Sequence, residues 1–405
     1  MPTHDGEGAF VIVDHMKRVT MEGFETMHYL SNAYASGDHA VVYAETLADV
    51  RMDLMTHSVD FAIIHGLPGA YIANQQTDRR HGRHSVDADT FVTKVTYNGG
   101  VTWERIPAPV NIKHSECKRC AAEEDCHLNL HGTSVWGQGV QAPSVVYSHF
   151  NAPGVLMGVG SVGAEGSLSQ PDCTWLSVDG GVTWTDVAVG VHIFEYGDFG
   201  GILVMALHMS DGPTDKVFFS VDEGMCWNSV ALENAIHVQN IRHRTLSFLF
   251  LHVKLLFWLR MEPDGQRPRF VIHGIACHKG EHPHCSNDQK TLTPNGVVYT
   301  LDVQDQMQLR QCREEDYEVW RPLDNKKSPC LLGASVRIEK RRRDSKCLNG
   351  GDYKRKKFPE QPCACTEDDL MCDFGFHQVG RGEEKKCRPI PENKLPACKV
   401  IFAAK

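Results

Sequence analysis

The chain has 405 residues, of which 41% are hydrophobic and 23% are charged, and its formal net charge is -9 at pH 7. A chain of this length can bury a large core and favours more than one domain, and its composition excludes a wholly disordered chain. The negative net charge argues against a general nucleic-acid binder. Of the fifteen cysteines, eight lie between Cys312 and Cys398, which indicates a disulfide framework and an oxidising compartment.

From about residue 8 to 305, short β-rich runs alternate with turns rich in Gly, Asn, Asp and Ser, a pattern typical of repeated sheets. Three segments in this region, at residues 69–74, 154–160 and 200–206, have the small and apolar character of strands packed on both faces. We expect them to be the innermost strands of successive β-propeller blades. About four to five such blades are predicted.

One pattern of eight residues occurs three times, at residues 96–103, 177–184 and 220–227. An Asn or Asp in its third position can accept backbone N–H groups in a tight hairpin, Gly takes the φ > 0 position, and a final Trp buries its ring between adjacent sheets. The copies begin 81 and 43 residues apart, and a period of about 40 to 50 residues is typical of propeller blades. We interpret the pattern as a structural Asp box, whose key residues are Asn98, Trp103, Asp179, Trp184, Asp222 and Trp227.

The composition changes near residues 305–311, after which charged residues, cysteines and prolines dominate. We therefore predict an all-β chain of two domains, with residues 1–305 as part of a propeller and residues 306–405 as a small disulfide-rich module. The first residues lack the basic start and apolar core of a signal peptide, and the longest apolar stretch, residues 246–259, is too short to span a bilayer. These features together suggest a piece of a longer secretory protein.

The module opens with CREEDYEVW at residues 312–320 and continues through CLLG at 330–333, CLNGGDY at 347–353 and DDLMCDFGF at 368–376. Together with SVDEG at 220–224 and DCHLNLH at 125–131, these motifs resemble the sortilin family of vacuolar-protein-sorting (Vps-ten domain) receptors. The likeness covers roughly residues 36–398. Within the family, YAETLADVR at 43–51 and YIANQ at 71–75 look nearer to the sortilin-related neuronal receptors than to sortilin itself.

This resemblance implies a ten-bladed propeller with a wide tunnel, then a ten-cysteine module, a membrane span and a cytosolic tail. Measured against that plan, we expect the chain to be the C-terminal part of the propeller followed by a module truncated after its eighth cysteine, with the span and the tail missing. The implied location is the lumen of the secretory pathway or the cell exterior, with the full-length relative a single-pass membrane protein of Golgi, endosomes and cell surface.

The resemblance also implies disulfides and leaves Cys120, Cys365 and Cys398 without partners, while Cys226 could pair with a cysteine outside this chain. The implied pairs are Cys117–Cys126, Cys312–Cys347, Cys330–Cys363 and Cys372–Cys387. Metal chelation is the rival reading for residues 117–127 and for residues 277–285, where three histidines lie between two cysteines. Because an oxidising compartment favours the bridge, we predict disulfides at both places and neither a metal nor another cofactor.

In the resembled family, ligands insert an end into the tunnel and add to an inner blade edge. The corresponding surface would lie near Arg51, Tyr71, Ile72 and Asn74, with Arg51 meeting a peptide carboxylate, although a shifted alignment places Asp49 there. The competing interpretation makes Tyr71 and Ile72 blade core and Arg51 a solvated loop residue. The implied partners are peptide or protein cargo, including propeptides or neuropeptides, with no nucleic acid, and a homodimer stays an open alternative.

Two basic runs, at residues 340–343 and 354–357, are interpreted as solvated hairpin faces, with a proprotein-convertase site as the alternative for the first. The twenty-two histidines raise the hypothesis of a switch between neutral and acidic pH.

The rival functional class is a sialidase-like glycoside hydrolase, since Asp boxes also occur in such enzymes. That chemistry needs an arginine cluster, a Tyr/Glu pair and an acid, and the sequence does not assemble this set. We therefore predict a non-catalytic cargo-binding ectodomain.

Overall fold

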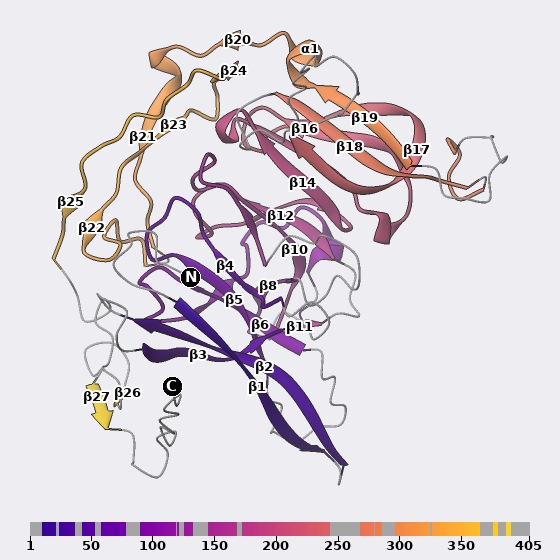
Figure 1. Cartoon of the computed structure of the whole chain (residues 1–405). Coiled ribbons are helices and arrows are strands. Elements are labelled where there is room, and N and C mark those ends of the chain that lie inside the picture. Colours follow the sequence, from indigo (N-terminus) through magenta and orange to yellow (C-terminus); the bar gives the residue numbers. More distant parts are fainter. Residues whose placement is uncertain are drawn as a thin grey trace, which may run out of the picture.

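The computed structural model describes residues 10–21, 24–36, 43–52, 58–77, 90–118, 120, 125–132, 145–167, 172–243, 268–278, 280–285, 296–324, 326–364, 376–379 and 386–389. Within them nearly all regular structure is β-strand (Figure 1), which confirms the predicted β character.

The first large sheet is built by the N-terminal half of the chain. Its strands are β1 (Phe10–Met21), β2 (Phe24–Ser36), β3 (Tyr43–Arg51), β4 (Phe61–Ile63), β5 (Tyr71–Gln76), β6 (Thr90–Thr96), β7 (Glu104–Pro107), β8 (His127–Leu130), β9 (Tyr147–Ser148), β10 (Leu156–Gly163), β11 (Gly166–Ser167), β12 (Cys173–Ser177) and β13 (Thr185–Val189). Their order is β1-β2-β3-β5-β6-β7-β8-β10-β12-β13, with β4 beside β5, β9 beside β10 and β11 beside β6.

The second large sheet follows in simple chain order. Its strands are β14 (His192–Gly197), β15 (Ile202–Leu207), β16 (Thr214–Ser220), β17 (Asn228–His243), β18 (Arg269–Ala276) and β19 (Gly296–Asp302). The helix α1 (Val303–Met307) comes directly after β19, and Asp302 caps its first turn by accepting the N–H groups of Gln304 and Asp305.

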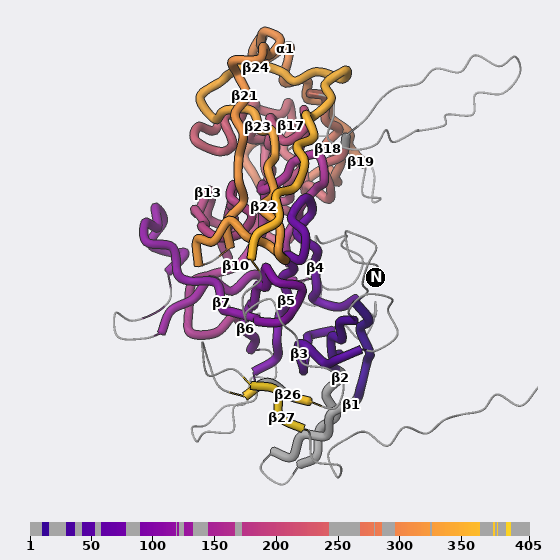
Figure 2. Tube along the Cα trace, turned by 90° about the vertical axis from the view of Figure 1, so that its left-hand side faces the viewer, coloured from indigo at the N-terminus to yellow at the C-terminus, as the bar shows by residue number. Residues whose placement is uncertain are grey.

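The cysteine-rich part forms pairs of short strands. They are β20 (Arg310–Gln311) with β24 (Cys347–Leu348), β21 (Tyr317–Trp320) with β23 (Ile338–Arg341), β22 (Ala334–Ser335) with β25 (Gln361–Pro362), and β26 (Phe376–Val379) with β27 (Lys386–Pro389). We call residues 310–324 and 326–364 the strap, because in Figures 1 and 2 this segment runs along one side of the large sheets.

Within the residues that the structure describes, three units of four antiparallel strands repeat, and we call them blades. Blade I is β4-β5-β6-β7, blade II is β9-β10-β12-β13, and blade III is β14-β15-β16-β17. The apolar segments predicted to be innermost form β5, β10 and β15, which are the second strands. The expectation that they come first in their blades is therefore wrong. The sequence pattern did not reveal β4 and β9, because strands of three and two residues are too short for a recognisable pattern.

All three copies of the eight-residue pattern form one turn, between the third and fourth strands of a blade. Asn98, Asp179 and Asp222 accept the backbone N–H four residues later at 3.0, 2.9 and 2.9 Å. The hydroxyl of the first residue accepts a second N–H in each copy, from Gly100, Gly181 and Gly224. The repeated sequence thus specifies a repeated hairpin by side-chain capping of its backbone.

The core of the described part of the chain consists of four clusters of apolar side chains. The tryptophans that end the repeats take part in three of them: Trp184 is a buried member between blades I and II, while Trp103 and Trp227 pack against the neighbouring clusters. Each blade therefore depends on the next one for burial of its apolar face.

A substitution at Gly200 tests whether blade III depends on its contact with blade II. Gly200 lies in the turn between β14 and β15 at φ +87 and touches blade II. A Cβ there would stand 2.7 Å from the Cβ and 2.9 Å from the Cα of Ala152. We expect Gly200→Ala to lower the free energy of unfolding by about 3 kcal/mol, through the left-handed conformation and the steric overlap. Urea denaturation with the disulfides intact measures the change.

Gly212→Ala is the matched control, since Gly212 has φ +108 but no atom within 4 Å of the added Cβ. It should cost about 1 kcal/mol, from the backbone conformation alone. Equal losses in the two variants would contradict the contact between blades II and III.

Candidate functional site

The residues predicted to meet a ligand lie inside the blades. Tyr71 and Ile72 are 3% and 1% exposed and belong to the clusters between sheets. Arg51 is 7% exposed, and its guanidinium carbon stands 5.1 Å from the centroid of the Phe91 ring. The prediction of an accessible ligand surface at these residues is wrong, because packing between neighbouring sheets covers them.

Asn74 is also fully buried, and it ties blade I to β8. Its Nδ2 donates to Asp60 Oδ2 at 3.1 Å and to the Leu130 carbonyl at 2.9 Å, while its Oδ1 accepts from Thr93 Oγ1 at 2.7 Å. A buried amide with its donors and acceptor engaged stabilises the fold. Asn74 is therefore a structural residue, and its assignment to a ligand surface is corrected as well.

The disulfides near the first repeat differ from the implied pattern. Cys117 pairs with Cys173, not with Cys126, and Cys126 pairs with Cys120. The reason is that the short 3-10 helix Ser115–Cys117 places the buried Cys117 against the start of β12, where the two Cα atoms are 5.6 Å apart. A link across 56 residues was not visible from sequence spacing.

In the strap the structure pairs Cys312 with Cys347 and Cys330 with Cys363, as the resemblance implies. Cys387 is disulfide-bonded, but Cys372, its implied partner, lies outside the described residues together with Cys365 and Cys398. Cys226, at the end of the third repeat, is an exposed free thiol.

The strap contacts each blade at one recurring place, where the turn after the first strand meets the turn of the repeat. In blades I and II these turns are joined by hydrogen bonds, Gly99 N to Gly69 O and Gly180 N to Gly154 O, each 2.9 Å long. The glycines leave shallow sockets, since a Cβ on Gly69 would overlap Leu332 and one on Gly154 would overlap Trp320. Leu332 and Trp320 of the strap fill the sockets.

In blade III the corresponding contact is polar and is made by Arg341. Its Nη2 donates to the carbonyls of Gly201 and Val221 at 2.7 and 2.6 Å, and its Nη1 donates to the carbonyl of Cys347. The side chain is 4% exposed, and it lies 3.7 Å from a carboxylate oxygen of Asp198. One buried guanidinium thus joins two blade turns to the strap.

Asp198 completes this contact from the blade side. It accepts the backbone N–H groups of Asn349 and Gly350 at 2.8 and 2.9 Å. Burial raises the pKa of Asp198 to about 6, although these N–H groups and the guanidinium of Arg341 favour the charged form. The carboxylate is therefore held in the interface at a cost in desolvation.

Glu223 occupies the position of Gly99 and Gly180 in the third repeat. It has φ +50, which disfavours a residue with a side chain, and it is buried. Its carboxylate lies 3.3 Å from Lys340 Nζ and 3.7 Å from Arg343 Nε. Where the first two repeats have a glycine, the third repeat thus has a carboxylate, and basic side chains of the strap neutralise it.

The basic run at residues 340–343 is therefore not a solvated face, and this interpretation is corrected for Lys340 and Arg341, which are buried. Lys340 Nζ also donates to the carbonyl of Val178 in blade II at 3.0 Å. The sequence alone did not predict this contact, because a run of basic residues on a short strand is typical of a solvent-exposed face. The carboxylates beside Lys340 and Arg341, those of Glu223 and Asp198, lie more than a hundred residues earlier in the chain.

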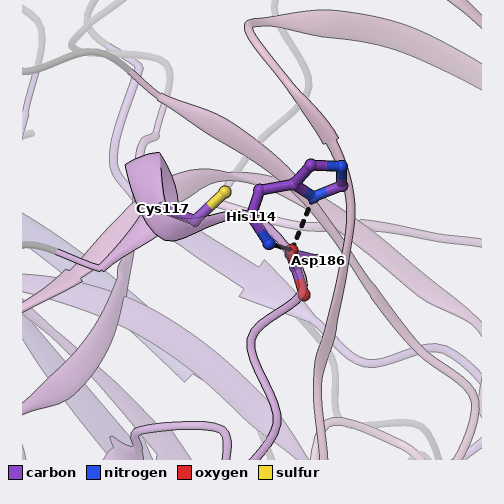
Figure 3. Close-up of side chains that lie close together, drawn as sticks. All are labelled: His114, Cys117 and Asp186. Atoms are coloured by element: carbon purple, nitrogen blue, oxygen red, sulfur yellow. Dashed lines mark hydrogen bonds and ion pairs between the residues drawn. The ribbon is translucent and has the colours of Figure 1, made fainter.

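Two groups of side chains have the proximity of metal ligands, but each contains paired cysteines. Figure 3 shows His114, Cys117 and Asp186, where Cys117 is bonded to Cys173. Burial raises the pKa of Asp186, yet hydrogen bonds from Lys113 N and from the N–H and ring of His114 outweigh it and hold the pKa below its usual value. The second group contains Cys312 and Cys347, which are bonded to each other. In the described residues, both groups are explained by disulfide and hydrogen bonds.

One Tyr/Glu pair that the sequence did not reveal lies between blades II and III. The hydroxyl of Tyr147 donates to Glu195, which also accepts the N–H of Tyr196 at 2.9 Å. Glu195 is 5% exposed, whereas Tyr147 is partly buried and packs against the apolar cluster shared by blades II and III. Among the described residues, no helix is long and apolar enough to cross a membrane.

Comparison with known proteins gives family matches on both parts of the chain. The family model described as "Sortilin, neurotensin receptor 3" matches residues 4–241, and the model described as "Sortilin, neurotensin receptor 3, C-terminal" matches residues 262–401.

Among curated relatives, sortilin of Mus musculus is 28% identical over 89% of this chain and 39% of its own length. Vacuolar protein sorting/targeting protein 10 of Lodderomyces elongisporus is 26% identical over 87% of this chain and 23% of its own. VPS10 domain-containing receptor SorCS2 of Homo sapiens is 27% identical over 88% of this chain and 27% of its own. The chain thus spans 39% or less of these relatives, and the similar identities do not place it nearer to one branch.

Replacing Arg341 tests whether the strap depends on the buried guanidinium. Arg341→Met would leave Asp198 buried without its cation and the bonded carbonyls without a donor. We expect the free energy of unfolding to fall by about 3 to 5 kcal/mol, measured by urea denaturation. The adjacent Arg342, whose partner Asp344 is exposed, is the control, and Arg342→Met should leave the free energy of unfolding nearly unchanged. Similar losses in both variants would contradict this role of Arg341.

Asp198 predicts a pH dependence of known sign. A folded-state pKa of about 6 lies above the ordinary value, so the folded state binds a proton that the unfolded state releases. Its contribution to stability therefore grows as the pH falls from about 7 to about 4, by on the order of 3 kcal/mol. Asp198→Asn, which keeps a residue tolerant of the left-handed φ, removes this dependence.

The quantity to measure is the difference in free energy of unfolding between the unsubstituted chain and Asp198→Asn at each pH, because other titrating groups then cancel. This difference should shift in favour of the unsubstituted chain on acidification. A difference that stays constant, or that shifts toward the variant, would refute the raised pKa.

Proposed function

Because the chain belongs to the family of sortilin and the Vps10 sorting receptors, we propose that it forms the cargo-binding region of such a receptor. Its ligands are peptides or proteins, and propeptides and neuropeptides are the first classes to test. The observation that carries the proposal is that family models match both the blades and the strap, at residues 4–241 and 262–401.

The disulfides support a location in the lumen of the secretory pathway or outside the cell. Five are present in the described residues, and bridges of this number persist in oxidising compartments. The matched part makes up 39%, 23% and 27% of the three relatives named above, so membrane attachment and traffic between Golgi, endosomes and lysosome or vacuole are proposed for a whole receptor.

We place the cargo at the first strands of the blades, not at the four buried residues. Within the described chain, β4, β9 and β14 each pair with the second strand of their own blade. An extended peptide can add its main chain to such a strand, while nearby side chains select its sequence. The strap supports this arrangement, since it links the three blades on one side (Figure 2).

A glycoside hydrolase is the competing proposal. The relatives are named as a sortilin, a vacuolar protein sorting/targeting protein and a VPS10 domain-containing receptor, and the carboxylate of Glu195 is buried beneath Tyr147. These observations favour binding over catalysis.

The test uses the chain secreted from eukaryotic cells behind an added signal peptide. Fluorescent propeptide and neuropeptide probes are titrated with the protein, and polarisation is recorded. We expect saturable binding with a Kd of about micromolar or tighter, lost after the disulfides are reduced and alkylated.

A fluorogenic sialoside is incubated with the same preparation. Its hydrolysis would favour the enzyme. Failure of all peptide probes by the folded, oxidised chain would contradict the receptor proposal.

A further inference from the structure

An Asn-Gly pair, Asn349–Gly350, directly follows β24 at the contact between the strap and blade III. In such a pair the side-chain amide is prone to spontaneous deamidation, because glycine has no side chain to hinder attack by its own nitrogen. The chain has two other Asn-Gly pairs, Asn98–Gly99 in the first repeat and residues 295–296. Gly350 has φ +79, so the backbone at this place favours glycine and with it the labile pair.

Deamidation consumes both nitrogens of this pair that can donate to blade III. The backbone nitrogen of Gly350 loses its proton to solvent and attacks the Cγ atom of Asn349. The bond between Cγ and Nδ2 breaks, the amide nitrogen leaves as ammonia, and a succinimide ring remains. Water then opens the ring, so that aspartate or isoaspartate stands at position 349.

In the folded chain, Asp198 holds both nitrogens. Its Oδ1 accepts the N–H of Gly350 at 2.9 Å, while its carbonyl oxygen and its Oδ2 accept Nδ2 of Asn349 at 2.7 and 3.2 Å. On the other side of the amide, the hydroxyl of Tyr317 donates to Asn349 Oδ1 at 2.8 Å. The side-chain amide of Asn349 is thus fixed from both ends.

The succinimide cannot keep the bonds to Asp198, because it has neither the N–H of Gly350 nor the amide nitrogen of Asn349. Forming the ring within this contact therefore breaks three hydrogen bonds to a fully buried aspartate. The carboxylate of Asp198 also disfavours removal of the proton from the Gly350 nitrogen, since that would place a second negative charge beside it. Both effects slow deamidation while the strap is bonded to Asp198.

The product does not fit the same contact. A carboxylate at position 349 has no proton to donate, and it would stand beside the carboxylate of Asp198, where like charges repel each other. An isoaspartate would in addition lengthen the backbone directly before Gly350. A strap modified in this way would bind blade III less tightly than the unmodified strap.

We propose that Asn349 is a deamidation site that the closed strap protects and that opening of the strap exposes. In a chain whose strap has opened, Asn349 loses its amide, and the new carboxylate then hinders the strap from closing again. The modification thus makes a transient opening permanent. No step of it depends on the proposed cargo.

The rate of deamidation at Asn349 is followed by peptide mass mapping of the folded, oxidised chain during incubation at neutral pH. The synthetic peptide of residues 348–353 gives the rate in the absence of the contact. We expect the folded chain to react more slowly than the peptide by about tenfold or more, because the reaction requires a local opening that breaks several hydrogen bonds. Equal rates in the two would overturn the proposal, and this comparison needs no variant.

Asp198→Gly removes the accepting carboxylate and suits the left-handed φ of +50 at this position. Deamidation at Asn349 should then be faster than in the unsubstituted chain by about tenfold or more. Asn98 is the internal control, since the N–H of Gly99 donates to the carbonyl of Gly69, and its rate should stay the same. Acceleration of both sites to the same extent, or of neither, would contradict local protection by Asp198.

Asn349→Asp tests whether the product hinders closing, and Asn349→Ala is its matched control. Both variants lack the donors of Nδ2, but only Asn349→Asp adds a charge beside Asp198. Hydrogen–deuterium exchange of the Gly350 amide, compared with the amides of β15, should therefore be faster in Asn349→Asp than in Asn349→Ala. The same exchange rate in the two variants would show that the new carboxylate does not hold the strap open.

Discussion

The arrangement of strap and blades depends on one buried guanidinium. Arg341 donates to carbonyls of two turns in blade III and to one in the strap, and the carboxylates of Asp198 and Glu223 lie beside the same interface. Removing two charges from water is costly, so such a contact is stable only when its hydrogen bonds are complete. Three residues of this interface on the blade side, Asp198, Phe199 and Glu223, have left-handed φ values without being glycine. The strap and blade III therefore hold each other in conformations that neither would favour alone.

The other two blades receive the strap by a simpler rule. Their turns carry glycines where a Cβ would overlap Leu332 or Trp320, so apolar side chains of the strap seat against backbone. Repetition of the hairpin turn places these sockets at equivalent positions of successive blades. The repeated sequence thus creates a similar surface on each blade, and the strap contacts all three of these surfaces. The strap thereby holds the three blades together as one unit.

Part of this structure could be predicted from the sequence. The three copies of the pattern were enough to predict the hairpin turns. Their hydrogen bonds are local, because Asn98, Asp179 and Asp222 each accept the N–H of the residue four positions later. The pairs Cys312–Cys347 and Cys330–Cys363 came from a family resemblance. What failed depends on distant contacts: Cys117 meets Cys173 across 56 residues, and the burial of Arg51 and Arg341 is decided by sheets from other parts of the chain. The first strands of blades I and II were missed because two or three residues carry too little pattern.

We expect the strap and the blades to open as one cooperative unit that is joined at Asp198. Hydrogen–deuterium exchange of the Asn349 and Gly350 amides, which donate to Asp198, distinguishes joint from separate opening. In the oxidised chain these two amides should exchange as slowly as the amides of β15 in blade III, because both sets open only when the interface does. Rapid exchange at Asn349 and Gly350 while β15 stays protected would show that the strap opens independently of the blades.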